Sequence, residues 1–109
     1  MKAFKNVNIY VEGAGVVKTD MIFGAEIEKI GKTVENAEII TLPEDAVVVP
    51  GFIDEHIHGA GGSDAMDGNF DALHTVADTV KKEGTTSFLA TTMTQSRENI
   101  SNALKAVKE

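Results

Sequence analysis

The pattern of apolar residues changes at Pro50-Gly51, and no other feature limits the fold as strongly. Before this point, short alternating or β-branched runs are separated by glycines, as in residues 7–11 and 16–23. Such runs predict a small antiparallel β-domain over residues 1–49. Further short strands are expected at residues 26–30, 38–42 and 46–49. After Gly51 a helical spacing of apolar residues enters the chain, so we predict an α/β protein with a β-rich N-terminal part.

The second half of the chain has the order strand, helix, strand, helix. Residues 52–58 alternate as a strand does, and residues 85–92 are rich in β-branched side chains. Between them, an apolar stripe predicts a helix that begins after Asp67 or Asn69 and ends at Gly84. The stripe consists of Phe70, Leu73, Val76, Ala77 and Val80. A last helix is expected to begin at Ser96 and to bury Ile100, Ala103, Leu104 and Val107. A strand, a helix and a strand with short links imply parallel pairing and a right-handed crossover.

Two of the three histidines, His56 and His58, stand two residues apart at the end of the expected strand 52–58. Alternation puts both imidazoles on one face of that strand, where they could bind one metal ion. Asp54 shares this parity and is expected either to bind the metal or to accept a ring N–H from a histidine. Two histidines on a solvated strand face also occur by chance and then bind nothing. Glu55 is expected to point the other way, toward the helix layer, where an apolar residue would be usual.

Other polar and glycine positions flank this pair. The Gly-Ala-Gly-Gly run at residues 59–62 is expected to end the strand and to let the backbone approach a ligand. Residues 92–96 should lie at the same rim as His58, because the carboxyl ends of parallel strands meet there. The threonines of this region either bind substrate or satisfy the backbone, and we favour the backbone role. They are Thr91, Thr92 and Thr94. His74 is expected to be a surface or partly buried histidine rather than a ligand.

The charge balance and the absence of cysteine limit the partners and ligands. Asp and Glu number 17 against 10 Lys and Arg, for a net charge of −7, which argues against nucleic acid and anionic membranes as partners. The sequence has no cysteine, so a bound metal must take nitrogen and oxygen ligands. No apolar run approaches the roughly 18 residues of a spanning helix, and the first residues lack the apolar core of a signal peptide. We expect a cytoplasmic protein.

Residues 50–59, Pro-Gly-Phe-Ile-Asp-Glu-His-Ile-His-Gly, resemble the signature that opens the catalytic barrel of the amidohydrolase superfamily. Gly-Gly-Ser-Asp after it, with residues 84–88 and 89–94, is similar to the branch of that superfamily that deacetylates phosphorylated amino sugars. The resemblance implies a metal-dependent hydrolase that removes acetate from N-acetylglucosamine 6-phosphate in amino-sugar catabolism. It implies His56 and His58 as metal ligands. It also implies zinc, iron or manganese as the divalent ion, with one or two ions in each full-length subunit.

The resemblance further implies that the chain is the N-terminal portion of a longer enzyme. Its 109 residues are too few for a closed (β/α)8 TIM barrel, which takes about 250. Residues 1–49 would be a portion of a small β-sandwich, and residues 50–109 the first βαβα of an incomplete barrel. The catalytic residues, the remaining ligands and the phosphate-binding groups are expected beyond Glu109, so this chain alone is expected to be inactive. The resemblance also implies a homodimer for the full-length protein.

Two alternatives remain open from the residues alone. One is another amidohydrolase, acting on a cyclic amide or deaminating a nucleobase. The other is a non-catalytic, β-rich binding module in which the two histidines have no metal role. The groups that would decide between these alternatives and a sugar deacetylase are those that recognise the substrate.

Overall fold

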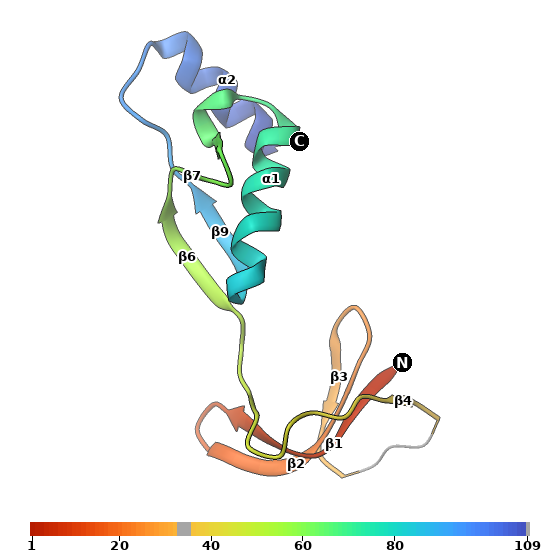
Figure 1. The fold of residues 1–109 in the computed structure, drawn as a ribbon. Coiled ribbons are helices and arrows are strands. Elements are labelled where there is room, and N and C mark those ends of the chain that lie inside the picture. The colour runs from red at the N-terminus through yellow and green to blue at the C-terminus, as the bar shows by residue number, and fades with distance from the viewer. Residues whose placement is uncertain (33–35, 109) are drawn as a thin grey trace. The chain divides into compact units, whose positions relative to one another are not determined.

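The chain folds as two compact units, Met1–Pro50 and Gly51–Glu109. A computed structural model describes residues 1–32 and 36–108. In these residues the regular elements of the first unit are all strands, whereas the second unit combines strands and helices (Figure 1). The predicted α/β class with a β-rich N-terminal part is therefore confirmed. Within the two described ranges, no helix is long and apolar enough to cross a membrane.

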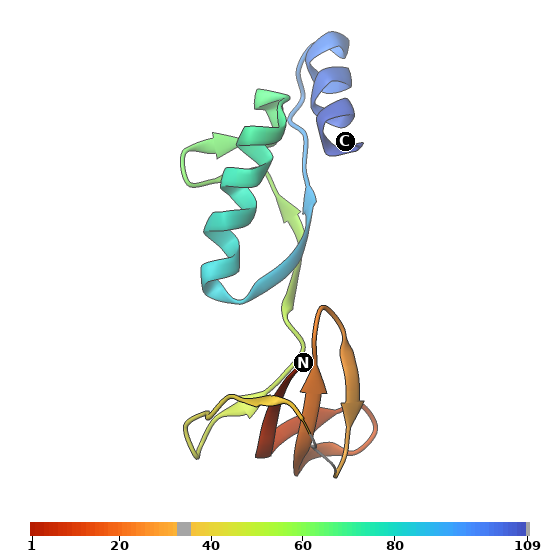
Figure 2. The ribbon, with the colours of Figure 1, turned by 90° about the vertical axis from the view of Figure 1, so that its right-hand side faces the viewer.

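The first unit is one five-stranded sheet with the order β3-β2-β1-β4, in which β5 also pairs with β1 (Figure 2). Its strands are β1 (Lys2–Val11), β2 (Gly15–Phe23), β3 (Ile27–Ile30), β4 (Glu38–Ile39) and β5 (Val47–Val48). The β1–β2 and β2–β3 pairs are antiparallel, as predicted. Gly13 and Gly15, with φ of 79° and 75°, make the turn between β1 and β2, because this backbone conformation favours glycine.

The last two strands of this unit correct the prediction of an antiparallel domain. Both β4 and β5 pair with β1 in parallel. Lys2-Ala3 of β1 faces β4 and Asn8-Ile9 faces β5, so the two short strands follow each other along one edge of β1. Alternating apolar residues identify a strand but carry no information about its direction.

A bulge in β1 gives the sheet its apolar face. Phe4 pairs with Met21 and Val7 with Thr19, so β1 advances three residues where β2 advances two. Asn6 lies in this bulge with a φ of 51°, and its N–H donates to Asp20 Oδ1 at 2.8 Å. The extra residue brings Val7 onto the face that carries Phe4 and Met21. The buried residues of the unit are Ala3, Ile9 and Met21.

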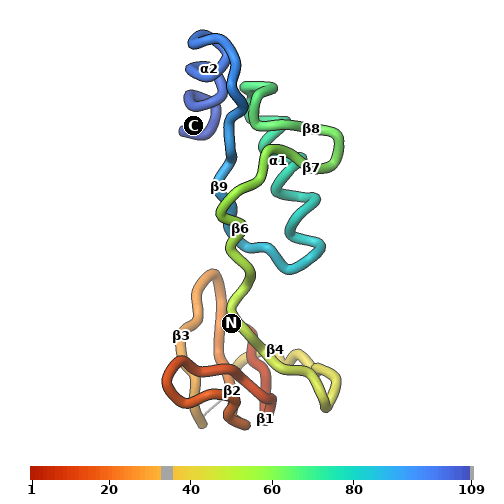
Figure 3. Tube along the Cα trace, turned by 90° about the vertical axis from the view of Figure 1, so that its left-hand side faces the viewer, coloured from red at the N-terminus to blue at the C-terminus, as the bar shows by residue number. Residues whose placement is uncertain are grey.

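The second unit is built on a parallel pair of strands joined by a helix. Its strands and helices are β6 (Phe52–Ile57), β7 (Gly59–Ala60), β8 (Ser63–Asp64), η1 (Ala65–Asp67), α1 (Phe70–Val80), η2 (Lys81–Glu83), β9 (Thr85–Ala90) and α2 (Arg97–Lys108). β6 and β9 are parallel, with α1 as the connection between them, and the short β7–β8 hairpin follows β6 (Figure 3). The unit thus combines strands and helices, and a short hairpin that the sequence did not predict stands between β6 and α1.

The predicted helix boundaries are also confirmed by their capping interactions. Asn69 Oδ1 accepts from the Ala72 N–H at 2.9 Å at the start of α1. Gly84, with a φ of 90°, ends η2 after α1. Ser96 Oγ accepts from the Asn99 N–H at 3.2 Å at the start of α2. The side chains of Asn69 and Ser96 thus accept hydrogen bonds from backbone N–H groups that have no partner within the first turn of a helix.

The inner face of α2 differs from the prediction. Its buried residues are Ala103 and Ala106, whereas Leu104 and Val107 are 56% and 52% exposed. Ala103 is buried as predicted, and Ala106 is buried instead of Leu104 and Val107. The other buried residues of this unit are Ala65, Ala72 and Val76.

Candidate metal-binding site

A bulge in β6 decides which side chains lie on the same face as the two histidines. Asp54 pairs with Phe88 and Ile57 with Ala90, so β6 advances three residues where β9 advances two. Phe88 and Ala90 line a cavity of about 280 Å³ together with α1 side chains, so their strand partners also face α1. His56 and His58 flank Ile57 and therefore leave the opposite face of the strand pair.

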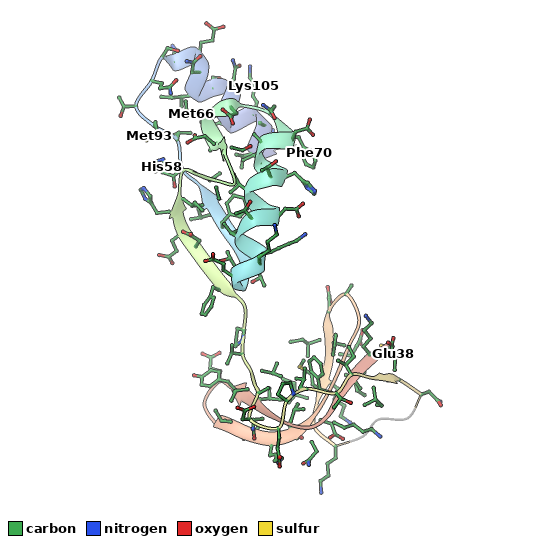
Figure 4. All side chains as sticks on the ribbon, viewed as in Figure 1. Glu38, His58, Met66, Phe70, Met93 and Lys105 are labelled. Atoms are coloured by element: carbon green, nitrogen blue, oxygen red, sulfur yellow. The ribbon has the colours of Figure 1, made fainter. Side chains whose placement is uncertain are left out.

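The two imidazoles lie next to each other on that face. Their ring centroids are 5.1 Å apart and the ring planes meet at 82°. His56 is exposed and His58 is half-buried. Figure 4 labels His58 at the carboxyl end of β6, the end of a parallel strand at which α/β barrels carry their catalytic groups. The predicted proximity of the two histidines is therefore observed.

A backbone acceptor fixes the His58 ring. Its Nδ1 lies 3.0 Å from the carbonyl oxygen of Thr91. Because a carbonyl oxygen only accepts hydrogen bonds, this contact requires the hydrogen on Nδ1, and in the neutral ring Nε2 then carries the lone pair. The backbone of His58 is held as well, since its carbonyl accepts from the Ala65 N–H at 2.8 Å. Sequence reasoning missed this acceptor, because a main-chain carbonyl leaves no mark on the sequence.

Asp54 does not take either of its predicted positions beside the histidine rings. Its Oδ1 accepts from the backbone N–H of His56 at 3.0 Å, and its strand partner Phe88 belongs to the α1 side. The prediction assumed unbroken alternation from Asp54 to His58, which the bulge interrupts. Glu55 is affected in the same way: it lies within the bulge and is exposed. Because the Glu55 carboxylate is exposed to water, an apolar side chain is not required at this position.

The glycines after His58 belong to a short hairpin. Gly59 pairs with Asp64 across the hairpin, and a Cβ on Gly59 would lie 2.2 Å from the Ser63 carbonyl oxygen. Gly61 and Gly62, with φ of 64° and 83°, form its two-residue turn. Two consecutive positive φ values are those of a type I′ turn, which matches the twist of a hairpin. At Gly59 the lack of a Cβ is therefore required by the hairpin itself, whereas Gly62 has open space beside it.

Thr91 and His74, two further polar residues of the sequence analysis, interact with neighbouring residues of the fold. The Thr91 hydroxyl donates to the Leu89 carbonyl at 3.2 Å, which is the backbone role favoured for it. His74 is a surface residue, with 63% of its side chain exposed, and its Nε2 lies 3.5 Å from Asp78 Oδ2. The pKa of Asp78 is lowered chiefly because Lys81 Nζ donates to its carboxylate at 2.5 Å.

The donor set suits a metal ion but is incomplete. Residues 1–32 and 36–108 contain no group of three or more His, Cys, Asp or Glu side chains that could hold a metal. The pair offers the free Nε2 lone pair of His58 and, beside it, the His56 ring. Imidazole nitrogen binds zinc and divalent iron well. Two imidazoles amount to half of the four ligands that zinc usually takes.

The strand-helix-strand unit and its histidine pair lie within a region that matches a known protein family. The amidohydrolase family model matches residues 47–109, and the chain belongs to that family. It is 51% identical over 70 residues to N-acetylglucosamine-6-phosphate deacetylase from Bacillus subtilis. This matched region covers 64% of this chain and 18% of that protein. It is 59% identical over 49 residues to the deacetylase of the same name from Lysinibacillus sphaericus, covering 45% of this chain and 13% of that protein.

A solved structure extends the similarity to nearly the whole chain. The crystal structure of N-acetylglucosamine-6-phosphate deacetylase from Pasteurella multocida matches 98% of this chain and 29% of its own length. The TM-score is 0.79 and the sequence identity 27%. The chain thus spans less than a third of that structure, and the matches to the two curated relatives cover 18% and 13% of their lengths.

Proposed function

We propose that this chain is the N-terminal part of a metal-dependent deacetylase that hydrolyses N-acetylglucosamine 6-phosphate to glucosamine 6-phosphate and acetate, a step of amino-sugar catabolism. The observation that carries the proposal is the adjacent histidine pair at the carboxyl end of β6, within the region that matches the amidohydrolase family. The resemblance of residues 50–62 and 84–94 to sugar deacetylases supports the choice of substrate.

In this proposal the boundary between the two domains lies between residues 49 and 50, and the second domain is the beginning of a barrel. Residues 50–109 are the first βαβα of a (β/α)8 barrel. The exposed side chains of Ile53 and Leu89 support this: both alternate with residues that face α1, and they are 68% and 62% exposed. In a closed barrel the face away from the helices is the interior, where bulky apolar side chains pack in layers. Further strands would therefore cover both residues.

Residues 1–49 are a portion of a β-sandwich in the same proposal. Tyr10 and Val16 face each other across β1 and β2, and they are 47% and 57% exposed. A cross-strand pair of large apolar side chains is a surface onto which a second sheet packs. The bulge at Asn6 gives the sheet a second, more apolar face, so both faces have side chains for a partner layer.

His56 and His58 are the proposed metal ligands, and zinc, iron or manganese suits their nitrogen donors. A divalent ion bound by the pair would supply Lewis acidity, which lowers the pKa of a bound water and polarises a carbonyl oxygen. The chain's own residues orient the ligands. Thr91 holds the His58 ring, and the Asp54 carboxylate holds the backbone of the bulge through the His56 N–H. The other ligands, the acid/base group and the phosphate-binding groups belong to later parts of the full-length protein, which we propose to be a homodimer.

Acetate release from N-acetylglucosamine 6-phosphate tests the proposal, with the natural full-length polypeptide and added Zn²⁺, Fe²⁺ or Mn²⁺. The parent protein should turn over, and a His56→Ala/His58→Ala variant should lose activity by about 100-fold or more if both ligands are lost. His74→Ala is the matched control, because it removes an exposed histidine of the same unit. The isolated 109-residue chain should be inactive.

Each result has a separate meaning. Turnover that survives in the folded double variant would keep the substrate and would refute the two histidines as required ligands. A parent protein that binds metal without releasing acetate would refute the substrate and would favour an amidohydrolase with another substrate. Turnover by the isolated chain would refute the need for later ligands.

A further inference from the structure

The hydrogen bond between His58 and Thr91 lies at the point where the β6–β9 ladder ends. The Thr91 N–H donates to the Ile57 carbonyl at 2.8 Å, continuing the ladder one residue beyond β9. In a parallel ladder the Thr91 carbonyl would next accept from the backbone N–H two residues further along, that of Gly59. Gly59 belongs instead to the β7–β8 hairpin, where it pairs with Asp64. The His58 ring supplies the donor that the backbone no longer provides.

The replacement donor defines the tautomer of His58. A free neutral imidazole favours the hydrogen on Nε2, which would place the lone pair on Nδ1. At 3.0 Å from an oxygen that only accepts, Nδ1 must carry the hydrogen, and Nε2 is the basic atom. The Ala65 N–H bond to the His58 carbonyl, at 2.8 Å, prevents the main chain from turning the ring away from Thr91.

His56 differs from its neighbour. Its backbone N–H is bound by Asp54, and its ring makes an edge contact with the His58 ring. In the described parts of the chain, neither ring nitrogen of His56 has a hydrogen-bond partner. The His58 ring is therefore fixed in tautomer and direction, whereas the His56 ring can adopt either tautomer.

We propose that the Thr91 main-chain carbonyl is a positioning group that keeps His58 in the Nδ1–H tautomer and presents Nε2 to the metal, while His56 acts as the adaptable ligand. The inference rests on the proposed metal role of the pair. A carbonyl acceptor behind a ligating histidine orients the ring and raises its basicity, and loss of such a group typically lowers metal affinity about 10- to 100-fold.

The first test is the ¹⁵N spectrum of the imidazole rings in the natural full-length protein, without metal and at alkaline pH. His58 should show a protonated Nδ1 and an unprotonated Nε2, and His56 should show the Nε2–H form or a mixture. His58→Asn and His56→Asn variants assign the signals. A His58 ring with its hydrogen on Nε2 overturns the proposal whatever the enzyme activity.

The second test weakens the carbonyl without changing a side chain. The α-hydroxy analogue of threonine at position 92, incorporated by nonsense suppression, turns the Thr91 carbonyl into an ester carbonyl, which is a poorer acceptor. The same substitution at position 94 weakens the Met93 carbonyl and is the matched control. The ester at position 92 should shift His58 toward the Nε2–H form and should weaken Zn²⁺ binding about 10-fold in a chelator competition. The ester at position 94 should change neither.

The outcomes separate this inference from the proposed function. Unchanged tautomer and Zn²⁺ affinity in the position-92 ester overturn the positioning role, even if the parent releases acetate. A parent protein with the expected tautomer that binds no Zn²⁺ also overturns it, because there is then no ligand to position. A protein that binds Zn²⁺ through a correctly oriented His58 but releases no acetate refutes only the proposed substrate.

Discussion

Gly59→Ala should destabilise the second unit, because the β7–β8 hairpin has no room for a methyl group. A Cβ on Gly59 would lie 2.2 Å from the Ser63 carbonyl oxygen and 2.9 Å from Asp64 Cα. Both are backbone atoms, so neither can turn aside as the end of a side chain would. The hairpin must open by roughly 1 Å to restore van der Waals separation. Overpacking of this kind costs about 1–3 kcal/mol of unfolding free energy.

Gly62→Asn is the matched control in the same hairpin. Gly62 has a φ of 83°, and nothing lies within 4 Å of an added Cβ. Asparagine adopts this left-handed conformation more readily than other non-glycine residues, so the larger side chain should lower the unfolding free energy by about 1 kcal/mol at most. Urea denaturation of the natural full-length protein measures both values, and amide exchange at Ala65 reports on the hairpin. The steric argument fails if Gly59→Ala has the same unfolding free energy as the parent, or if Gly62→Asn lowers the unfolding free energy as much as Gly59→Ala does.

Three further predictions concern α1. Val76→Ala should lower the unfolding free energy by about 2–3 kcal/mol, because a side chain only 2% exposed loses buried area and leaves a cavity; a loss below about 1 kcal/mol in urea would contradict this. Asn69→Ala should cost about 1 kcal/mol through loss of the Ala72 cap, whereas Asn69→Asp keeps the acceptor and should be near neutral in the same assay. Lys81→Ala should raise the pKa of Asp78 toward its ordinary value of 3.8 in an NMR titration. Because the folded-state pKa of Asp78 is depressed, its contribution to stability is present above that ordinary value and is lost as the pH falls through the folded-state pKa.

The two helices and the two paired strands of the second unit were predictable because their signals are local. The apolar stripe of α1, the capping side chains of Asn69 and Ser96, and the left-handed Gly84 lie within a few residues of the structure that they define. The β-branched run at residues 85–92 identified β9, and the strand-helix-strand order required parallel pairing with β6. The proximity of His56 and His58 followed from their spacing on one strand.

The features that escaped prediction depend on a partner elsewhere in the chain. The bulge that separates Asp54 from the histidine face exists only in the register between β6 and β9. The parallel direction of β4 and β5 depends on the connections between strands, which apolar alternation does not encode. Leu104 and Val107 were expected to be buried because helical spacing tells which side chains share a face, but not which neighbour covers that face.

The pairing of β6 with β9 also sets an order of events during synthesis. His58 and Thr91 are 33 residues apart in sequence, and the helix between them shortens the loop that must close. Both precede α2 in the sequence, so they emerge from the ribosome before it, and the ring can be held as soon as β9 meets β6. Until other surfaces cover them, Ile53 and Leu89 keep an apolar face open to water, which is the kind of surface that chaperones bind on growing chains. The orientation of one histidine is therefore settled early, while the nascent chain is most prone to aggregate.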